Sequence, residues 1–237
     1  MSQADNPYLA TNFLSVAQAD VNERASFITK TYLHLAGAIG AFVLLEAVLL
    51  NLPITESLVQ SVLGTRYGWL MMLGGFMAVS WIANGWAQSS TSLSTQYMGL
   101  GLYVVAEAIL MVPLLYMAQN YHSGVIAQAG VVTLGLFAVL TTVVFVTRKD
   151  FSFLRSVLIF GGFAAFGLIG FGIFFNFELG PIFTYAMIAF ACAYILYNTS
   201  NVMLHYRTSQ YVAASLALFA SVALLFWYVL QMFMSRD

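Results

Sequence analysis

Apolar residues in this chain gather into long runs that are separated by short polar connections. A helix needs about 20 mostly apolar residues to cross the hydrocarbon core of a bilayer. We therefore predict an all-α protein with seven membrane-spanning helices, over residues 31–52, 68–87, 97–118, 125–146, 154–175, 181–204 and 211–234. The longest connection, residues 51–67, has room for a short interfacial helix, and no connection has room for a separate soluble domain.

The composition supports this prediction and excludes several other classes of protein. Hydrophobic residues make up 61% of the 237 residues and charged residues only 7%, whereas a soluble domain carries roughly 25% charged residues. The lone cysteine, Cys192, excludes an intramolecular disulfide and a multi-cysteine metal site. A formal net charge of -1 leaves no basic face for nucleic acid.

The distribution of Lys and Arg predicts the orientation, because these residues are enriched in cytoplasmic segments. Residues 1–25 are polar and lack the features of a cleaved signal peptide, so we expect a cytoplasmic tail before a membrane domain of residues 26–237. The inner segments would then hold 6 basic residues against 2 in the outer segments. We predict that the N-terminus lies inside and, after seven spans, that the C-terminus lies outside.

The fifth predicted span is rich in glycine, at Gly161, Gly162, Gly167, Gly170 and Gly172. Small residues allow helix backbones to approach closely in lipid. The pattern predicts a tightly packed central helix, and a pore lined by backbone is the alternative.

A polar stripe marks the sixth predicted span. Tyr194, Asn198, Asn201 and His205 follow one another at spacings of 4, 3 and 4 residues, which places them on one helix face. Polar side chains in a span face the bundle interior or a wet cavity. The stripe is compatible with hydrogen bonds between helices and with a path for a solute or ion.

Glu46 and Glu107 are the carboxylates that lie within the predicted spans. A carboxylic acid at mid-membrane is expected to be neutral or paired. Either group can lock helices together as a hydrogen-bonded acid, act in a proton-coupled switch, or bind a cation. A hard cation such as calcium prefers several oxygen ligands, so one carboxylate with amides would make only a weak site.

Catalytic signatures are missing from the sequence. It has no His-Glu-x-x-His motif, no Gly-x-Ser-x-Gly elbow and no aspartate pair within the predicted spans. The two lysines, Lys30 and Lys149, lie outside the seventh span, so no retinal Schiff base is expected there. We predict a protein that is not an enzyme and has no catalytic, cofactor-binding or metal-ligating residues.

Two segments carry a family resemblance. The turn Thr147-Arg148-Lys149-Asp150-Phe151-Ser152-Phe153-Leu154 and the sixth-span segment Ile195-Leu196-Tyr197-Asn198-Thr199-Ser200-Asn201 resemble signatures of the Bax inhibitor-1 family. Pro113 and the span that follows Tyr211 also resemble that family, and the match covers roughly residues 26–235. The branch it resembles is bacterial.

The resemblance implies a fold in which six helices surround a central last helix, in a cell inner (plasma) membrane. It also implies a pH-sensitive calcium leak and, in some bacteria, an association with a membrane-anchored AAA protease of the FtsH type. In family members that leak, an aspartate of the sixth span pairs with an aspartate of the last span, and an arginine of the second span engages the pair. Two close carboxylates share a proton, which makes a pH switch.

This chain departs from that pattern at all three places. Asn198 and Ser221 stand at the two aspartate positions, and residues 68–87 hold no arginine. An amide and a hydroxyl can hydrogen-bond across the helices but cannot titrate, so we expect a permanent latch in place of the switch. Our first expectation is a membrane protein that modulates membrane-protein quality control through an FtsH-type protease. The alternative is a leak for calcium or another cation through Glu107, Asn198, Asn201 and Ser221, and a small-solute permease is a third possibility.

Overall fold

The chain forms a bundle of long helices in the computed structural model, which describes residues 15–65, 67–89 and 92–235. The helices in these ranges are α2 (Val21–Leu49), α3 (Ile54–Leu63), α4 (Gly68–Ala87), α5 (Leu93–Tyr121), α6 (Val125–Thr147), α7 (Leu154–Phe175), α8 (Gly180–Leu204) and α9 (Tyr211–Met234). Within the described ranges, seven helices, all except α3, are long and apolar enough to cross a membrane. The predicted all-α class and the seven predicted spans are therefore confirmed.

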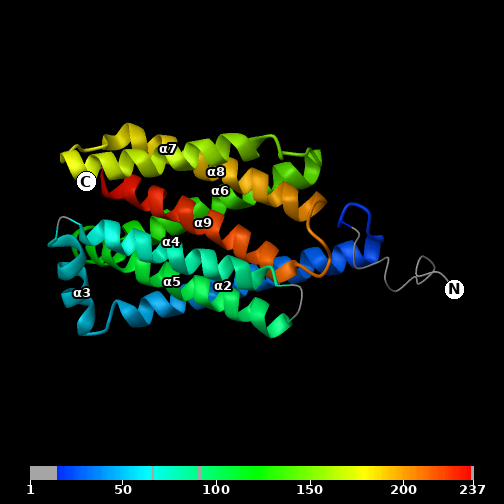
Figure 1. Cartoon of the computed structure of the whole chain (residues 1–237), viewed down its shortest axis with the longest axis horizontal. Coiled ribbons are helices and arrows are strands. Elements are labelled where there is room, and N and C mark those ends of the chain that lie inside the picture. The colour runs from blue at the N-terminus through cyan, green and yellow to red at the C-terminus, as the bar shows by residue number, and fades with distance from the viewer. Residues whose placement is uncertain (1–14, 66, 90–91, 236–237) are drawn as a thin grey trace.

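The last helix, α9, runs through the interior of the bundle (Figure 1). It packs against α2, α4, α5, α6 and α8, and 72% of its most apolar window is buried. Its sequence explains this position, because a helix that is apolar on all sides belongs in a core. Small residues on α9 let its neighbours approach closely, and the fully buried ones are Ala214, Ser215 and Ser221.

The prediction that the glycine-rich fifth span is a tightly packed central helix is wrong. This span is α7, which packs mainly against α8 at the edge of the bundle (Figure 1), and only 11% of its most apolar window is buried. Added Cβ atoms at Gly167 and Gly170 would meet nothing within 4 Å. Only Gly161 and Gly172, among the five, would place a Cβ closer than 3.0 Å to a neighbour. Gly167 and Gly170 therefore provide no contact with a neighbouring helix.

Helix boundaries differ from the predicted ones mainly in the first span. α2 begins at Val21 rather than at residue 31, because its polar first turns continue the helix beyond the apolar segment that hydropathy detects. α3, at Ile54–Leu63, is the short helix for which the longest connection had room. Pro113 lies inside α5 and is buried, and spans tolerate proline where neighbouring helices cover the freed backbone.

The segment before α2 folds back over the connection between α8 and α9. The Val16 amide donates to the Tyr206 carbonyl at 2.8 Å, and Val16 is fully buried. The Arg24 guanidinium donates to the Val16 carbonyl at 3.0 Å and to the Ala17 carbonyl at 2.6 Å. The first part of the expected tail, residues 1–14, lies outside the described residues, as do Arg66 and Arg236, the basic residues expected on the outer side.

Close packing of α4 against α5 makes a specific prediction at Gly99. A Cβ at Gly99 would lie 2.5 Å from both the Ala83 carbonyl oxygen and the Ala87 amide nitrogen. Because these are backbone atoms, Gly99→Ala should separate the helices and lower the free energy of unfolding by about 1–3 kcal/mol. Thermal unfolding in detergent measures this loss.

Gly101 provides the matched control on the same helix. A Cβ there would meet nothing within 4 Å, so Gly101→Ala should leave the unfolding temperature unchanged or raise it slightly, since alanine favours a helix by up to about 1 kcal/mol. Equal effects of the two substitutions would contradict the close approach of α4 and α5.

Candidate functional site

A buried hydrogen bond joins α8 to α9 where the family pattern has two aspartates. The Asn198 amide nitrogen donates to Ser221 Oγ at 2.7 Å and to the Ala217 carbonyl at 3.3 Å. The Ser221 hydroxyl donates in turn to the Ala217 carbonyl at 2.7 Å. Asn198 is 4% exposed and Ser221 0% exposed, so water does not compete for this bond. The expected contact between Asn198 and Ser221 is present, and we call it the latch.

Polar side chains connect the latch to Glu107. Tyr194 lies one turn before Asn198 and close to its side-chain amide. Tyr103 on α5 lies near both Tyr194 and Glu107. Glu107 is therefore linked to the predicted stripe through two tyrosines. Tyr103 is the member that the sequence analysis missed, although its position one turn before Glu107 on α5 was a signal that could have revealed it.

Glu46 on α2 lies near Glu107, close enough for the two carboxyl groups to repel each other when both are ionised. Glu46 is 5% exposed. Neither of its carboxyl oxygens has a hydrogen-bond partner among the described residues. Burying an unpaired carboxyl group is costly in a protein interior. This arrangement brings together the two intramembrane carboxylates that the sequence placed on separate helices.

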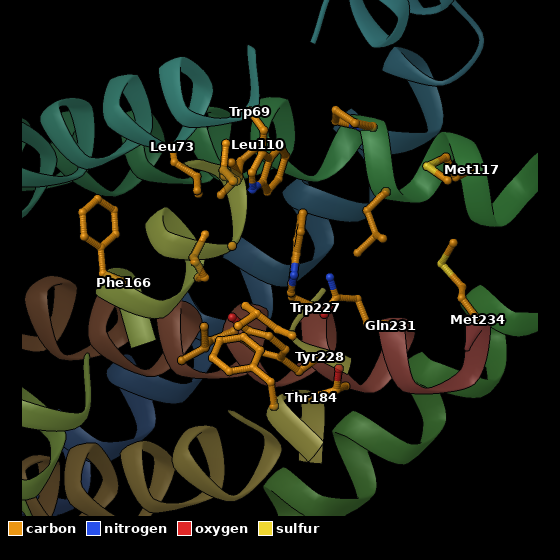
Figure 2. Close-up of a pocket in the computed structure, with 18 of the residues that line it drawn as sticks. Trp69, Leu73, Leu110, Met117, Phe166, Thr184, Trp227, Tyr228, Gln231 and Met234 are labelled. Carbon is orange, nitrogen blue, oxygen red and sulfur yellow. The ribbon is translucent and has the colours of Figure 1, made fainter. Parts of the chain in front are cut away.

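An open cavity of about 1230 Å³ leads to Glu107 from the C-terminal end of the bundle, where α9 ends. Figure 2 shows Trp69 and Leu110 on one wall, Tyr228 and Thr184 on the other, and Trp227 and Gln231 between them. The Trp69 and Trp227 rings stack at a centroid distance of 5.3 Å. Glu107, Tyr103 and Tyr194 also line the cavity. No sequence pattern predicted this cavity, because its walls come from helices far apart in the chain.

The two remaining members of the predicted stripe are not part of this chain of contacts. Asn201 is half-buried, and its backbone carbonyl accepts hydrogen bonds from the His205 and Tyr206 amides. His205 is exposed at the end of α8 and bonds through Nε2 to Asp150 Oδ2 at 3.0 Å. The stripe therefore divides into an inner half, Tyr194 and Asn198, and an outer half at the surface.

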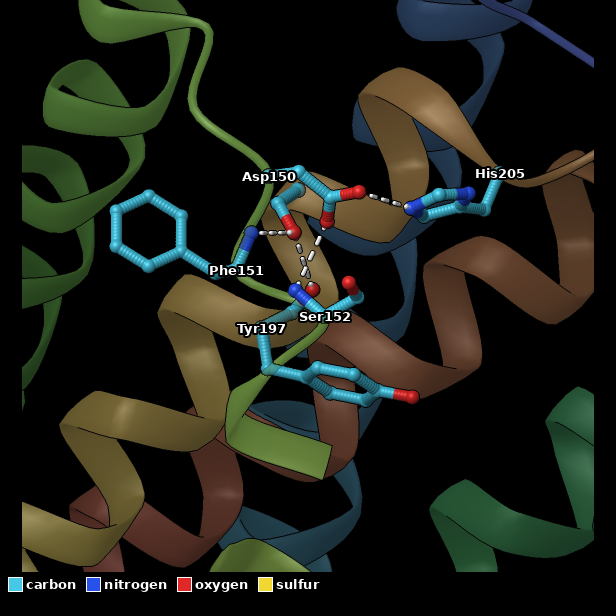
Figure 3. Close-up of polar contacts among 6 residues, drawn as sticks. Asp150, Phe151, Ser152, Tyr197 and His205 are labelled. Atoms are coloured by element: carbon cyan, nitrogen blue, oxygen red, sulfur yellow. Dashed lines mark hydrogen bonds and ion pairs between the residues drawn. The ribbon is translucent and has the colours of Figure 1, made fainter. Parts of the chain in front are cut away.

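The two segments that carried the family resemblance lie against each other (Figure 3). The Phe151 amide donates to Ser200 Oγ at 3.1 Å, and the Ser200 hydroxyl donates to the Tyr197 carbonyl at 3.1 Å. The Ser152 amide donates to Asp150 Oδ1 at 2.8 Å. That hydrogen bond, helped by His205, holds the pKa of Asp150 below its usual value. Asp150 thus fixes the turn to the end of α8.

The two basic residues of the turn take no part in the hydrogen bonds just described. Arg148 and Lys149 are exposed, and Arg148 ends α6 with a left-handed backbone conformation at φ 51°. A non-glycine residue in that conformation is uncommon. It allows the chain to reverse sharply so that Asp150 and Phe151 reach α8.

The described residues around the two carboxyl groups offer few ligands for a metal ion. No group of three or more His, Cys, Asp or Glu residues could hold a metal ion in the part of the chain that the structure describes. Glu46 and Glu107 provide two carboxyl groups, with hydroxyls from Tyr103 and Tyr194 nearby. Such a set falls short of the six to eight oxygens that calcium takes in a tight site.

Comparisons with known proteins place the sequence in a family. A family model described as "Inhibitor of apoptosis-promoting Bax1" matches residues 24–237. Bax inhibitor 1 of Schizosaccharomyces pombe is 25% identical over 97% of this chain and 85% of its own length. An uncharacterized protein of Pseudomonas aeruginosa is 30% identical over 67% of this chain and 68% of its own length. No solved structure matches the chain significantly.

The latch should contribute measurably to stability. Ser221→Ala removes the acceptor of the Asn198 amide and leaves that amide without its closest partner. Hydrogen bonds between membrane helices contribute roughly 0.6 kcal/mol and up to about 2 kcal/mol, so the unfolding free energy should fall by that amount. Equilibrium unfolding in mixed micelles measures the change.

Ser61→Ala is the matched control for Ser221→Ala. Ser61 is exposed on α3, and its hydroxyl donates to the Ser57 carbonyl one turn earlier, as the Ser221 hydroxyl does to Ala217. Its removal should change stability by less than about 0.5 kcal/mol. A Ser221→Ala variant as stable as Ser61→Ala would show that the latch bond does not stabilise the bundle.

Asp150 should stabilise the turn only above acidic pH. A depressed carboxyl pKa adds stability that is fully present above the unfolded value of 3.8 and is lost as the pH falls through the folded value. Asp150→Ala should therefore lower the free energy of unfolding at pH 7 by less than about 1 kcal/mol, because the pair of Asp150 with His205 is exposed. The unfolding temperature should fall slightly as a result. Below a pH of about 3.8 the difference from the unsubstituted protein should shrink.

Asp150→Asn separates charge from hydrogen bonding in that experiment, because asparagine keeps an acceptor for the Ser152 amide. The stability of Asp150→Asn at pH 7 should lie between that of Asp150→Ala and that of the unsubstituted protein. A difference between Asp150→Ala and the unsubstituted protein that stayed constant from pH 7 to pH 3 would contradict the role of the ionised carboxylate.

Proposed function

We propose that this chain, which belongs to the Bax inhibitor-1 family, is a non-enzymatic leak protein for calcium or another cation. The proposal places it in a bacterial inner membrane with its N-terminus in the cytoplasm and its C-terminus outside. In that orientation the cavity opens to the outer side, and the latch lies between Glu107 and the cytoplasmic end. A cation would enter through the cavity and meet the carboxyl groups before it reaches the latch.

The observation that carries the proposal is the unpartnered carboxyl group of Glu46 beside Glu107. Ionisable residues within a span are costly and mark pathways for ions or protons in many membrane proteins. Neither oxygen of Glu46 is satisfied by the described residues, and Glu107 is accessible from the cavity. A passing cation would supply the charge that this pair of carboxyl groups lacks.

Weak coordination fits a leak better than a storage site. Conduction requires binding that is favourable enough for entry and weak enough for exit. Two carboxyl groups and nearby tyrosine hydroxyls provide an intermediate set of ligands. Beyond Glu107, the hydrogen bond from Asn198 to Ser221 and the buried Val16 close the route, so only occasional opening would pass an ion.

The second proposal is regulation of a membrane-anchored AAA protease of the FtsH type. A latch without a titratable group makes α8 and α9 a static pair, which suits a scaffold more than a switch. Arg148 and Lys149 are exposed at the turn and available for contact with a partner. The leak has the stronger support, because the carboxyl pair and the cavity have no purpose in a purely static scaffold.

Replacement of Glu107 tests the leak directly. Glu107→Gln removes the ionisable carboxyl group that lines the cavity and keeps the size of the side chain, so calcium flux into proteoliposomes should fall to the level of empty liposomes. Ser221→Ala opens the latch and should raise the flux above that of the unsubstituted protein. A calcium-sensitive dye trapped in the liposomes reports both changes.

Glu56→Gln is the control, because Glu56 is an exposed carboxylate on α3 that bonds Gln60 within its own helix. It should leave the flux unchanged. Flux that Glu107→Gln leaves intact would reject Glu107 as part of the path. A protein that conducts no calcium or other cation at any pH would shift the assignment to the protease proposal.

A further inference from the structure

We infer that the cavity is a binding site for apolar organic cations, such as an amine or a quaternary ion that carries a bulky hydrophobic body. The inference goes beyond the leak of small ions and does not require conduction, because it concerns equilibrium binding within the cavity. It is carried by the size of the cavity, the carboxyl group at its inner end and the rings along its walls.

The cavity is far larger than a small ion needs. Its volume is about 1230 Å³, whereas pockets for drug-sized ligands measure about 300–1,000 Å³. Most of its wall is aliphatic or aromatic, and the wall contains Leu73, Leu110, Phe166 and Met234 (Figure 2). An apolar body buried there would leave water or lipid and fill space that a hydrated metal ion leaves empty.

Charge at the cavity selects a cation over an anion or a fatty acid. The acidic residues of its wall are Glu107 at the inner end and Glu178 near the mouth, and Glu46 lies behind Glu107. No Lys or Arg lines the cavity in the described ranges. A positively charged group next to Glu107 would form a charge-assisted contact in a site of low polarity, where such contacts are strong.

Aromatic faces add a second reason for a cation. Trp69 and Trp227 stack against each other at the cavity wall, and Tyr103 and Tyr194 lie beside Glu107 at the inner end. Cations within about 6 Å of such rings are attracted to the negative face, and aromatic cages recognise quaternary ammonium groups in this way. The same rings would pack against the apolar body.

The position of the cavity allows such a ligand to enter. The cavity lies between the α4–α5 pair and the α7–α8 pair. These two pairs are joined mainly through α9 (Figure 1). Polar residues ring the mouth at the C-terminal end, among them His122, Asn176 and Glu178. An amphipathic cation that collects at the membrane surface could move from there into the cavity.

Binding of tetraphenylphosphonium to the full chain in lipid nanodiscs tests this inference, with empty nanodiscs subtracted. The unsubstituted protein should bind it saturably, and triphenylphosphine oxide, a neutral analogue, should compete poorly. Glu107→Gln should weaken binding by about tenfold or more, the effect of one lost charge contact. Thr184→Trp should also abolish binding, because it fills the cavity and leaves Glu107 in place.

Val131→Trp is the matched control for Thr184→Trp, since Val131 is 74% exposed on α6 and remote from the cavity wall. It should bind the probe as the unsubstituted protein does, and it guards against a general effect of an added tryptophan. Equal binding by the neutral analogue, or full binding by both Thr184→Trp and Glu107→Gln, would overturn the inference and indicate partition into lipid or another site. An unsubstituted protein that binds the probe but conducts no calcium would contradict the leak and leave the inference about the binding site standing.

Discussion

Satisfaction of polar groups inside the membrane is the constraint on which the rest of this structure depends. Hydrocarbon offers no partners to a polar side chain, so each one must find a partner within the protein or remain costly. Asn198 meets this requirement through Ser221 on the neighbouring helix. The bond is possible because α9 is buried among five other spans, and it holds α8 in the register that places Tyr194 near Glu107.

Glu46 is one of several described side chains that do not meet this requirement, and it lies near Glu107. Its carboxyl oxygens have no hydrogen-bond partner among the described residues. Unsatisfied polar groups in a core persist when function requires them. The cavity then matters because Glu107 lines it and Glu46 lies near Glu107.

Most of the fold was predictable from the chain alone, and most of the site was not. The seven spans follow from apolar length, and the pairing of Asn198 with Ser221 follows from a family resemblance combined with register. The function of the glycines was mispredicted, because glycine content indicates that close approach is possible without showing that a neighbour is there. At Gly99 a neighbour exists, although this single glycine gave no pattern, and at Gly167 and Gly170 none does.

Sequence by itself determined the class of the protein, its spans and the scarcity of charge within them, because these depend on local composition and on the thickness of a bilayer. Tertiary structure decided which of the rare polar groups meet. The proximity of Glu46 to Glu107, the link through Tyr103 and Tyr194, and the stacked tryptophans of the cavity all join helices that are distant in sequence. Residues 46 and 107 come together only after α2 and α5 have packed, and no local pattern encodes how two apolar helices rotate about their axes.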